Sequence, residues 1–257
     1  MAYAPEYEAV HARWYDPTHS SRLADATFYR ELARETGGPV LELGCGTGRV
    51  LLPIAQDGLE CVGLDGSPAM LDALRAKQPP SNLHLVLAPM QDFDLGPARF
   101  RLVFAAFRPL QHLYTVEDQL ACLASVRRHL APGGLFAFDV FQPDLARLAL
   151  AEEPEYEESR FVDGGDEIVR LASASRDVAT QTQAVAIRFE RRRDGLAVGS
   201  ETERFRMRWY YRYEIEHLLA RAAFDVVALY GAFDRRPFDR DAKEMVFVAA
   251  TARASRP

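Results

Sequence analysis

The residues best placed to do chemistry are three glycines in alternate positions, Gly44, Gly46 and Gly48, directly after the apolar segment 40–43. Glycine adopts positive φ and lets a ligand approach the backbone, so this spacing predicts a tight turn that contacts a bound molecule. Arg49 stands where dinucleotide-binding turns have their last glycine, and the Gly-Lys-Ser/Thr sequence of a phosphate loop is absent. The pattern therefore disfavours a pyrophosphate-containing ligand.

A second candidate is Asp65, which follows the next apolar segment, 61–64. In open α/β sheets, ligands bind at the carboxyl ends of the parallel strands. A carboxylate at such a strand end can accept hydrogen bonds from both hydroxyls of a ribose. Because dinucleotides and adenosyl compounds both contain a ribose, Asp65 alone does not distinguish between them.

These residues lie in an alternation of strand and helix. Short apolar segments predict strands at residues 40–43, 61–64, 83–87, 102–106 and 135–139. Ser67, followed by proline, is typical of a helix start, as is Thr115 with an acidic residue three positions later. We also expect Ser21 to cap a helix that ends at Gly37. The alternation predicts an α/β fold, a doubly wound and mostly parallel sheet with helices on both faces.

The pattern changes after Phe141. From about Glu155 to Trp209 the apolar residues recur every second position, which predicts antiparallel sheet, with hairpin turns at 163–165 and 194–195. Helical spacing returns at 214–223, and strands at 226–229 and 246–250 complete a seven-stranded sheet. We therefore predict N-terminal helices and a cofactor-binding core at 1–141, an antiparallel β insertion at 142–212, and the C-terminal part of the core sheet at 213–257.

Composition narrows the class of protein. The chain has 257 residues and a formal net charge of −6, which argues against a nucleic-acid partner because phosphates favour a basic surface. The cysteines are odd in number and lack the close spacing of a metal site, so we expect reduced thiols, no metal and a cytoplasmic protein. No apolar segment approaches the length of a membrane span, and we expect no membrane partner.

The sequence resembles the class I S-adenosylmethionine-dependent methyltransferases, in particular small-molecule enzymes with a β-sheet insertion after strand five. Four motifs carry the resemblance: Glu42-x-Gly44-x-Gly46-x-Gly48, Val62-Gly63-Leu64-Asp65-Gly66-Ser67-Pro68-x-Met70-Leu71, Met90-Gln91-Asp92-Phe93 and Leu130-Ala131-Pro132-Gly133-Gly134. It covers roughly residues 20–140 and 214–250. The segment 107–113 departs from the family, which usually has a polar or acidic start after strand four.

The resemblance implies S-adenosyl-L-methionine as the cofactor. It implies that the glycine turn faces the methionine moiety, that Asp65 holds the ribose, and that Met70 and Met90 enclose the adenine. The family's N-terminal region folds over the cofactor as a lid, to which we assign Tyr15. Met70 as a core residue and Asp92 as a turn residue are the alternatives. The predicted cofactor site comprises Tyr15, Glu42, Gly44, Cys45, Gly46, Gly48, Asp65, Gly66, Met70, Met90, Gln91, Asp92 and Phe107, with Asp92 and the Gln91 backbone at the adenine edge.

The residues predicted to bind and activate the methyl acceptor follow from what methyl transfer requires of the protein. The protein must hold nucleophile, carbon and sulfur in line, and a general base helps when the acceptor is a hydroxyl. His112, after strand four, and Asp139, at the end of strand five, are the predicted catalytic residues; packing and a turn or cap role are the alternatives. The predicted substrate-binding residues are Arg108, His112, Arg208, Tyr210 and Tyr211. Inward-facing arginine would suit an anionic acceptor, whereas a solvated outer sheet face is the alternative.

These observations predict N- or O-methylation of a small molecule. An RNA or protein methyltransferase of the same fold is one alternative, although the acidic composition lacks the basic surface expected of it. A non-catalytic S-adenosylmethionine-binding protein is another, and the intact glycine turn and ribose acid disfavour it. Exposed strand edges in the insertion are suited to pairing two subunits, so a homodimer is plausible.

Overall fold

The core of the computed structural model, which describes residues 5–97 and 99–252, is a seven-stranded sheet in the order β10-β11-β5-β4-β1-β2-β3. The strands are β1 (Val40–Leu43), β2 (Cys61–Asp65), β3 (Leu83–Leu87), β4 (Phe100–Ala105), β5 (Leu130–Phe141), β10 (Phe224–Tyr230) and β11 (Glu244–Thr251). Among the seven described strands of this sheet, only β11 runs in the opposite direction to the others. The predicted doubly wound, mostly parallel sheet is therefore confirmed.

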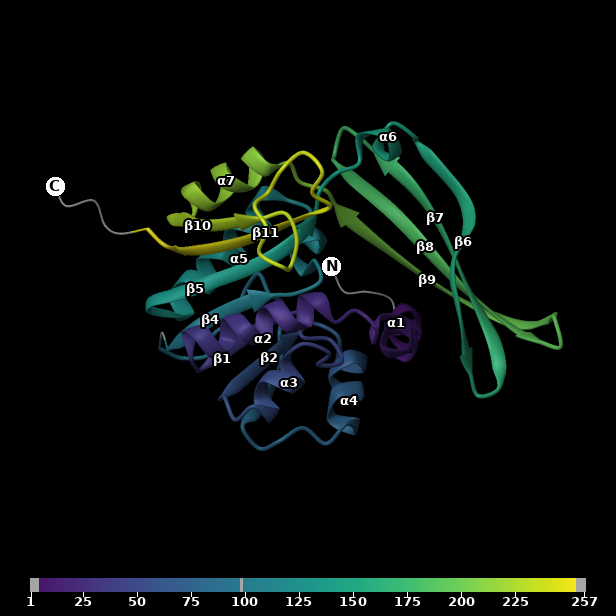
Figure 1. The fold of residues 1–257 in the computed structure, drawn as a ribbon, viewed down its shortest axis with the longest axis horizontal. Coiled ribbons are helices and arrows are strands. Elements are labelled where there is room, and N and C mark those ends of the chain that lie inside the picture. Colours follow the sequence, from purple (N-terminus) through teal and green to yellow (C-terminus); the bar gives the residue numbers. More distant parts are fainter. Residues whose placement is uncertain (1–4, 98, 253–257) are drawn as a thin grey trace.

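Helices cover both faces of this sheet (Figure 1). One face packs against α2 (Ala24–Thr36), α3 (Leu51–Gln56) and α4 (Pro68–Ala76). The other face packs against α5 (Val116–His129) and α7 (Arg212–Arg221). Each face buries its own apolar cluster, as expected for strands that are apolar on both sides.

Two of the three predicted helix caps form. The Ser67 hydroxyl accepts a hydrogen bond from the Met70 amide, and the Thr115 hydroxyl accepts one from Asp118. The cap predicted at Ser21 is wrong, because α2 begins only at Ala24. The chain around Ser21 instead closes the turn after α1 (Pro5–His19), in which Arg22 donates to the His19 carbonyl.

The insertion is a four-stranded antiparallel sheet of β6 (Glu152–Asp163), β7 (Asp166–Asp177), β8 (Thr182–Arg193) and β9 (Leu196–Arg208), with the short helix α6 (Leu145–Leu148) before it. Both predicted hairpin turns form. At the second turn, Asp194 and Gly195 have φ of 50° and 78°. Positive φ at both central positions is the requirement of a type I′ turn, and it explains the Asp-Gly pair.

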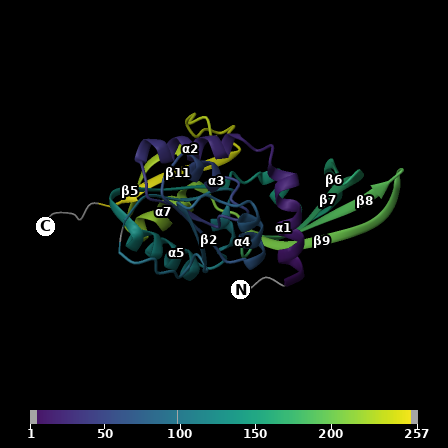
Figure 2. The same cartoon turned by 90° about the horizontal axis from the view of Figure 1, so that it is seen from below.

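Helix α1 lies between the core and the insertion (Figure 2). Trp14 is 3% exposed and stacks on Phe189 of β8, with ring centroids 5.2 Å apart. Its indole nitrogen donates to Glu201 of β9 at 2.7 Å. The apolar contacts and this bond together hold α1 against one face of the insertion.

The glycine turn leaves no space for a side chain at Gly48, and this can be tested. Gly48 has a φ of 78°, and a Cβ there would lie 2.4 Å from Leu74 Cδ1. Gly58 also has positive φ, but a Cβ there would meet nothing within 4 Å. We expect Gly48→Ala to lower the free energy of unfolding by about 1–3 kcal/mol more than Gly58→Ala, because only the first adds a clash to the backbone strain. Urea denaturation of both variants measures this, and equal losses would contradict the packing described.

Candidate active site

The glycine turn is fixed to the neighbouring strand. The Gly44 and Cys45 amides both donate to the Leu64 carbonyl of β2, at 2.7 and 3.0 Å. A Cβ at Gly44 would lie 2.9 Å from the Pro109 ring, which opens the short 3₁₀ helix η1 (Pro109–His112). The glycines therefore let the backbone bend at the carboxyl edge of the sheet while η1 packs directly against it.

Asp65 ends β2, beside this turn. Its Oδ2 accepts a hydrogen bond from the Gly46 amide and its Oδ1 accepts one from the Ser67 amide, both at 2.8 Å. Burial raises the pKa of the carboxyl. Met70 is 6% exposed, and its methyl group would lie 3.3 Å from a Cβ at Gly46. The structure thus brings together three residues of the predicted cofactor site.

Glu42 of β1 is a buried acid below the turn. It is 2% exposed, and burial raises the pKa of its carboxyl well above the ordinary value. Its Oε2 has no hydrogen-bond partner among the described residues. A buried polar atom without a partner fits a ligand that brings a donor to this position.

The residues predicted at the adenine are more scattered. Met90 is half-buried against the core, and the Gln91 carbonyl accepts a hydrogen bond from Ser125 of α5 at 3.1 Å. The Asp92 side chain is 93% exposed and lies 3.9 Å from Arg128. Gly66 is exposed beside Asp65, whereas Cys45 is buried. The role of Asp92 at the adenine edge remains a prediction.

Helix α1 is fastened to the glycine turn by residues that sequence patterns do not single out. Asp16 accepts a hydrogen bond from the Thr47 hydroxyl at 2.6 Å and pairs with Lys77 at 2.6 Å. Lys77 also donates to the Thr47 carbonyl at 2.7 Å. These three residues come from segments far apart in the chain, so no local spacing reveals their contact.

Arg49 provides a second fastening. It forms an ion pair with Asp25 of α2 at 2.5 Å, and the side chains are 8% and 1% exposed. Its guanidinium also lies near Tyr15, whose pKa burial raises to about 12. Arg49, which stands where dinucleotide-binding turns have their last glycine, therefore connects α1 and α2 to the turn. Tyr15, the predicted lid residue, lies at this junction.

The turn after β4 is strained. Phe107 and Arg108 have φ of 63° and 73°, a region that non-glycine residues occupy at a cost of about 1–3 kcal/mol each. Asp139 is 1% exposed, and its Oδ1 accepts hydrogen bonds from the Phe107 amide at 2.9 Å and the Tyr29 hydroxyl at 2.7 Å. Through the bond to the Phe107 amide, the Asp139 carboxylate holds this turn in position. Arg108 pairs with Glu244 at 2.6 Å.

The Phe107 ring of the strained turn packs against aromatic residues of α1. Its centroid lies 4.9 Å from the His19 ring and 6.3 Å from the Tyr15 ring. The Arg22 guanidinium lies 4.7 Å from the same centroid, within the range of a cation–π contact. The predicted cofactor residues Tyr15 and Phe107 are therefore neighbours across α1 and the core.

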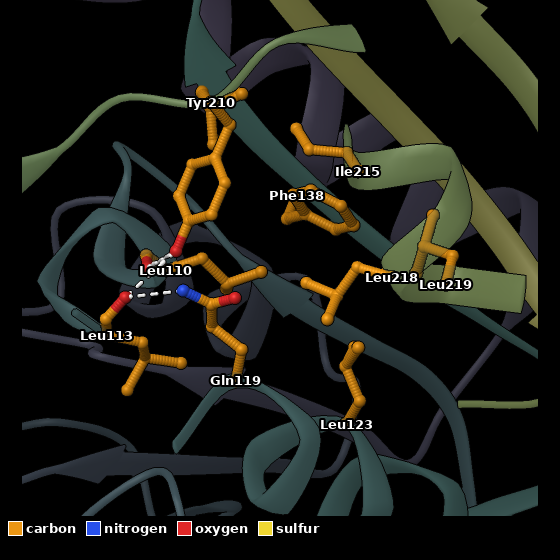
Figure 3. A pocket seen from close by; sticks show the side chains of 10 residues that line it. Leu110, Leu113, Gln119, Leu123, Phe138, Tyr210, Ile215, Leu218 and Leu219 are labelled. Carbon is orange, nitrogen blue, oxygen red and sulfur yellow. Dashed lines mark hydrogen bonds between the residues drawn. The ribbon is translucent and has the colours of Figure 1, made fainter. Parts of the chain in front are cut away.

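His112 ends η1 and faces the insertion, where its ring lies 6.1 Å from that of Phe205. Burial lowers the pKa of His112 to about 4. Figure 3 shows how Tyr210 holds η1: its hydroxyl donates to the Leu110 and Leu113 carbonyls, at 3.1 and 2.9 Å, and all three residues line a mainly apolar pocket. Gln119 also donates to the Leu113 carbonyl, at 2.9 Å. Tyr210 thus supports η1.

The other predicted substrate residues lie apart from this centre. Arg208 ends β9, where it donates to the Tyr114 carbonyl at 2.9 Å and pairs with Glu214 at 2.7 Å. Tyr211 precedes α7 and is 44% exposed. The described contacts of Arg208 hold the insertion to the core, and its role toward an anionic acceptor stays a prediction.

Comparison with known proteins fits this geometry. Residues 40–134 match the family model described as Methyltransferase domain. A dTDP-3-amino-3,4,6-trideoxy-alpha-D-glucopyranose N,N-dimethyltransferase of Streptomyces venezuelae is 33% identical over 136 residues, which are 50% of this chain and 56% of the relative. A dTDP-3-amino-3,6-dideoxy-alpha-D-glucopyranose N,N-dimethyltransferase of Streptomyces fradiae is 26% identical over 187 residues, 67% and 68% of the two chains. The chain spans about half the length of the first of these relatives.

The solved structures extend the likeness to the insertion. The CcbJ methyltransferase of Streptomyces caelestis has a TM-score of 0.82 and 29% identity, and the match covers 98% of this chain and 100% of that one. The chain thus resembles a methyltransferase domain over residues 40–134 and shares the fold of a solved methyltransferase over 98% of its length. The resemblance seen in the four sequence motifs is thereby confirmed. Among the described residues, no helix has the length and apolar character of a membrane span.

The buried position of Asp139 predicts a pH effect on stability. Burial raises its pKa from 3.8 to about 6, so between these pH values the folded protein binds more protons than the unfolded chain. The contribution of Asp139 to the free energy of unfolding therefore falls as the pH rises from about 4 to 6, by on the order of 2–3 kcal/mol. We expect Asp139→Asn to gain stability relative to wild type across this window. Urea denaturation at several pH values measures the gain.

The exposed Asp225→Asn provides the control for this series, because it removes a carboxyl from the surface and not from the interior. A constant difference for Asp139→Asn would show that the carboxyl of Asp139 does not titrate in this window.

Proposed function

We propose that this chain transfers the methyl group of S-adenosyl-L-methionine to an amine of a small molecule. The observation that carries the proposal is the contact between the Asp65 carboxylate and the Gly46 amide at the carboxyl edge of β1 and β2. It joins a ribose-binding acid to a positive-φ glycine turn that lacks the spacing for a pyrophosphate.

The residues present suit such a cofactor. The Asp65 carboxylate would bind the ribose hydroxyls, and the partnerless Oε2 of Glu42 would accept a hydrogen bond from the methionine end. Met70 would cover one side of the adenine, and Met90 with the Gln91 backbone would contact its other side and edge. Tyr15 on α1 would close the site from above, because Asp16 and Arg49 hold the helix over the turn.

The names of the relatives favour nitrogen as the acceptor atom. Both Streptomyces relatives described above are named as N,N-dimethyltransferases of amino sugars. The region between α1, η1 and β9 would receive the acceptor, with His112 and Phe205 on its border. A small-molecule substrate is part of this proposal, as are a cytoplasmic location and a homodimer paired through the edge strand β6.

The chemistry would place modest demands on the protein. When bound, S-adenosylmethionine supplies a methyl group on a positively charged sulfur that departs as a neutral sulfide. The residues around η1 and α1 would orient the acceptor nitrogen in line with the methyl carbon and exclude water, so that proximity supplies much of the rate. Asp139 would act indirectly, by holding the strained Phe107 turn in place.

Calorimetric titration with S-adenosylmethionine and, separately, with NAD tests the cofactor. We expect micromolar binding of S-adenosylmethionine and a loss of at least tenfold in Asp65→Ala, because the ribose hydroxyls lose a charged acceptor worth roughly 1.5–3 kcal/mol. Asp72→Ala, on the exposed side of α4, is the matched control. No binding of S-adenosylmethionine, or tighter binding of NAD, would overturn the proposal.

Methyl transfer tests the acceptor class. Methyl-labelled S-adenosylmethionine is incubated with the two amino-sugar nucleotides named for the relatives, with simple primary amines, and with hydroxyl analogues of each. We expect label on amine acceptors only. Label on the hydroxyl analogues, on RNA or on protein in parallel incubations would contradict the proposal that the acceptor is an amine of a small molecule.

A further inference from the structure

Two buried polar residues in the last turn of α5, Ser125 and His129, hold the chain segment that follows β3. Each of them is 1% exposed. The Ser125 hydroxyl donates to the Gln91 carbonyl at 3.1 Å, and the Leu95 amide donates to Nε2 of His129 at 2.9 Å. The stretch 91–95 is therefore bonded to α5 at both of its ends, by side chains that the proposed function does not use.

The two ring nitrogens of His129 have different roles. Nδ1 lies 2.7 Å from the Ser125 carbonyl, one helical turn earlier, and a carbonyl oxygen can only accept a hydrogen bond. Nδ1 therefore carries the proton, and Nε2 is the bare nitrogen that accepts from the Leu95 amide. The contacts on both sides select one neutral tautomer, which connects a carbonyl of α5 to the backbone of the stretch 91–95.

Further contacts surround this link. The His129 ring lies 4.7 Å from the ring of Phe93, which is 4% exposed. The Arg99 amide donates to the His129 carbonyl at 3.1 Å, and Arg128 donates to the Phe93 carbonyl at 3.4 Å. Asp94 lies 3.8 Å from Nε2 of His129, but its side chain is 92% exposed, so water screens its charge. The buried contacts therefore determine where the stretch lies against α5.

The same stretch begins at the residues that the proposed function places beside the adenine. The Gln91 backbone would contact the edge of the base, and Met90 would contact one of its faces. The Ser125 hydroxyl binds the Gln91 carbonyl, and the Asp92 amide donates to the Pro89 carbonyl at 3.4 Å. These two bonds fix the orientation of the peptide that joins Gln91 to Asp92. Hydrogen bonds to a base edge weaken steeply with distance and angle, so recognition of the base depends on where this peptide is held.

We propose that Ser125 and His129 are positioning residues for the adenine of the cofactor. The inference rests on the proposed function. Each residue acts through a backbone group of the stretch 91–95, Ser125 through the Gln91 carbonyl and His129 through the Leu95 amide. We expect their loss to weaken recognition of the base and to leave binding of the ribose and of the homocysteine end unchanged, because Asp65 and the glycine turn lie on other segments.

A purely structural role in holding α5 to the core is the competing explanation. Thr115 offers a matched comparison, because its hydroxyl caps the other end of the same helix by accepting from the Asp118 amide. Thr115→Ala and Ser125→Ala each remove one hydroxyl from α5, and only the second removes a bond to the stretch 91–95. A structural role alone predicts that both variants lose stability and that neither changes recognition of the base.

The test compares S-adenosylhomocysteine with S-inosylhomocysteine, whose base has a carbonyl oxygen and a ring N–H where adenine has an amino group and a bare nitrogen. Calorimetry gives the ratio of the two dissociation constants, in which contacts to the shared ribose and homocysteine cancel. In wild type we expect a preference for adenine of at least about tenfold, because exchanged donors and acceptors leave polar groups unpaired. In Ser125→Ala and His129→Leu we expect this preference to fall on the order of fivefold.

A conservative variant and the control assign this effect. His129→Gln offers an amide oxygen that can accept from the Leu95 amide, so we expect it to restore most of the preference that His129→Leu loses. Thr115→Ala is expected to keep the preference of wild type. Failure of wild type to bind S-adenosylhomocysteine would overturn the proposed function itself. Binding of S-adenosylhomocysteine with an unchanged preference in Ser125→Ala and His129→Leu, or an equal loss in Thr115→Ala, would overturn the positioning role alone.

Discussion

The hydrogen bond from the Gly46 amide to the Asp65 carboxylate is the contact on which the site depends. It joins the ends of β1 and β2, so the glycine turn and the carboxylate of Asp65 keep one relative position. Glycine is needed here because the backbone takes positive φ while Met70 closes against it. The buried carboxylate is held by two backbone amides, which offsets part of the cost of removing its charge from water.

Polar contacts between distant segments hold α1 against the glycine turn. Asp16, Thr47 and Lys77 fasten α1 to the glycine turn, while Arg49 and Asp25 join it to α2. On its other side α1 packs through Trp14 on the insertion. One helix therefore contacts both the glycine turn and the insertion.

Local sequence patterns predicted the sheet, the hairpins and the glycine turn, because each rests on spacing within a few residues. The cap at Ser21 failed because the turn after α1 takes up that segment. Arg49 was interpreted only as a missing glycine, although its ion pair with Asp25 organises the site. His11 and Glu203 are 192 positions apart, and no pattern within either segment indicates their contact. Which distant side chains come into contact depends on the topology of the fold, and the spacing of residues along the sequence does not reveal it.

We propose that this edge of the sheet holds an adenosyl cofactor beneath α1. A crystal structure of the chain grown with S-adenosylhomocysteine would show whether it does. We expect both ribose hydroxyls on the Asp65 carboxylate, the homocysteine end over the glycine turn, and α1 closed above them. Ligand bound away from Asp65, or a ribose held by other residues, would contradict it.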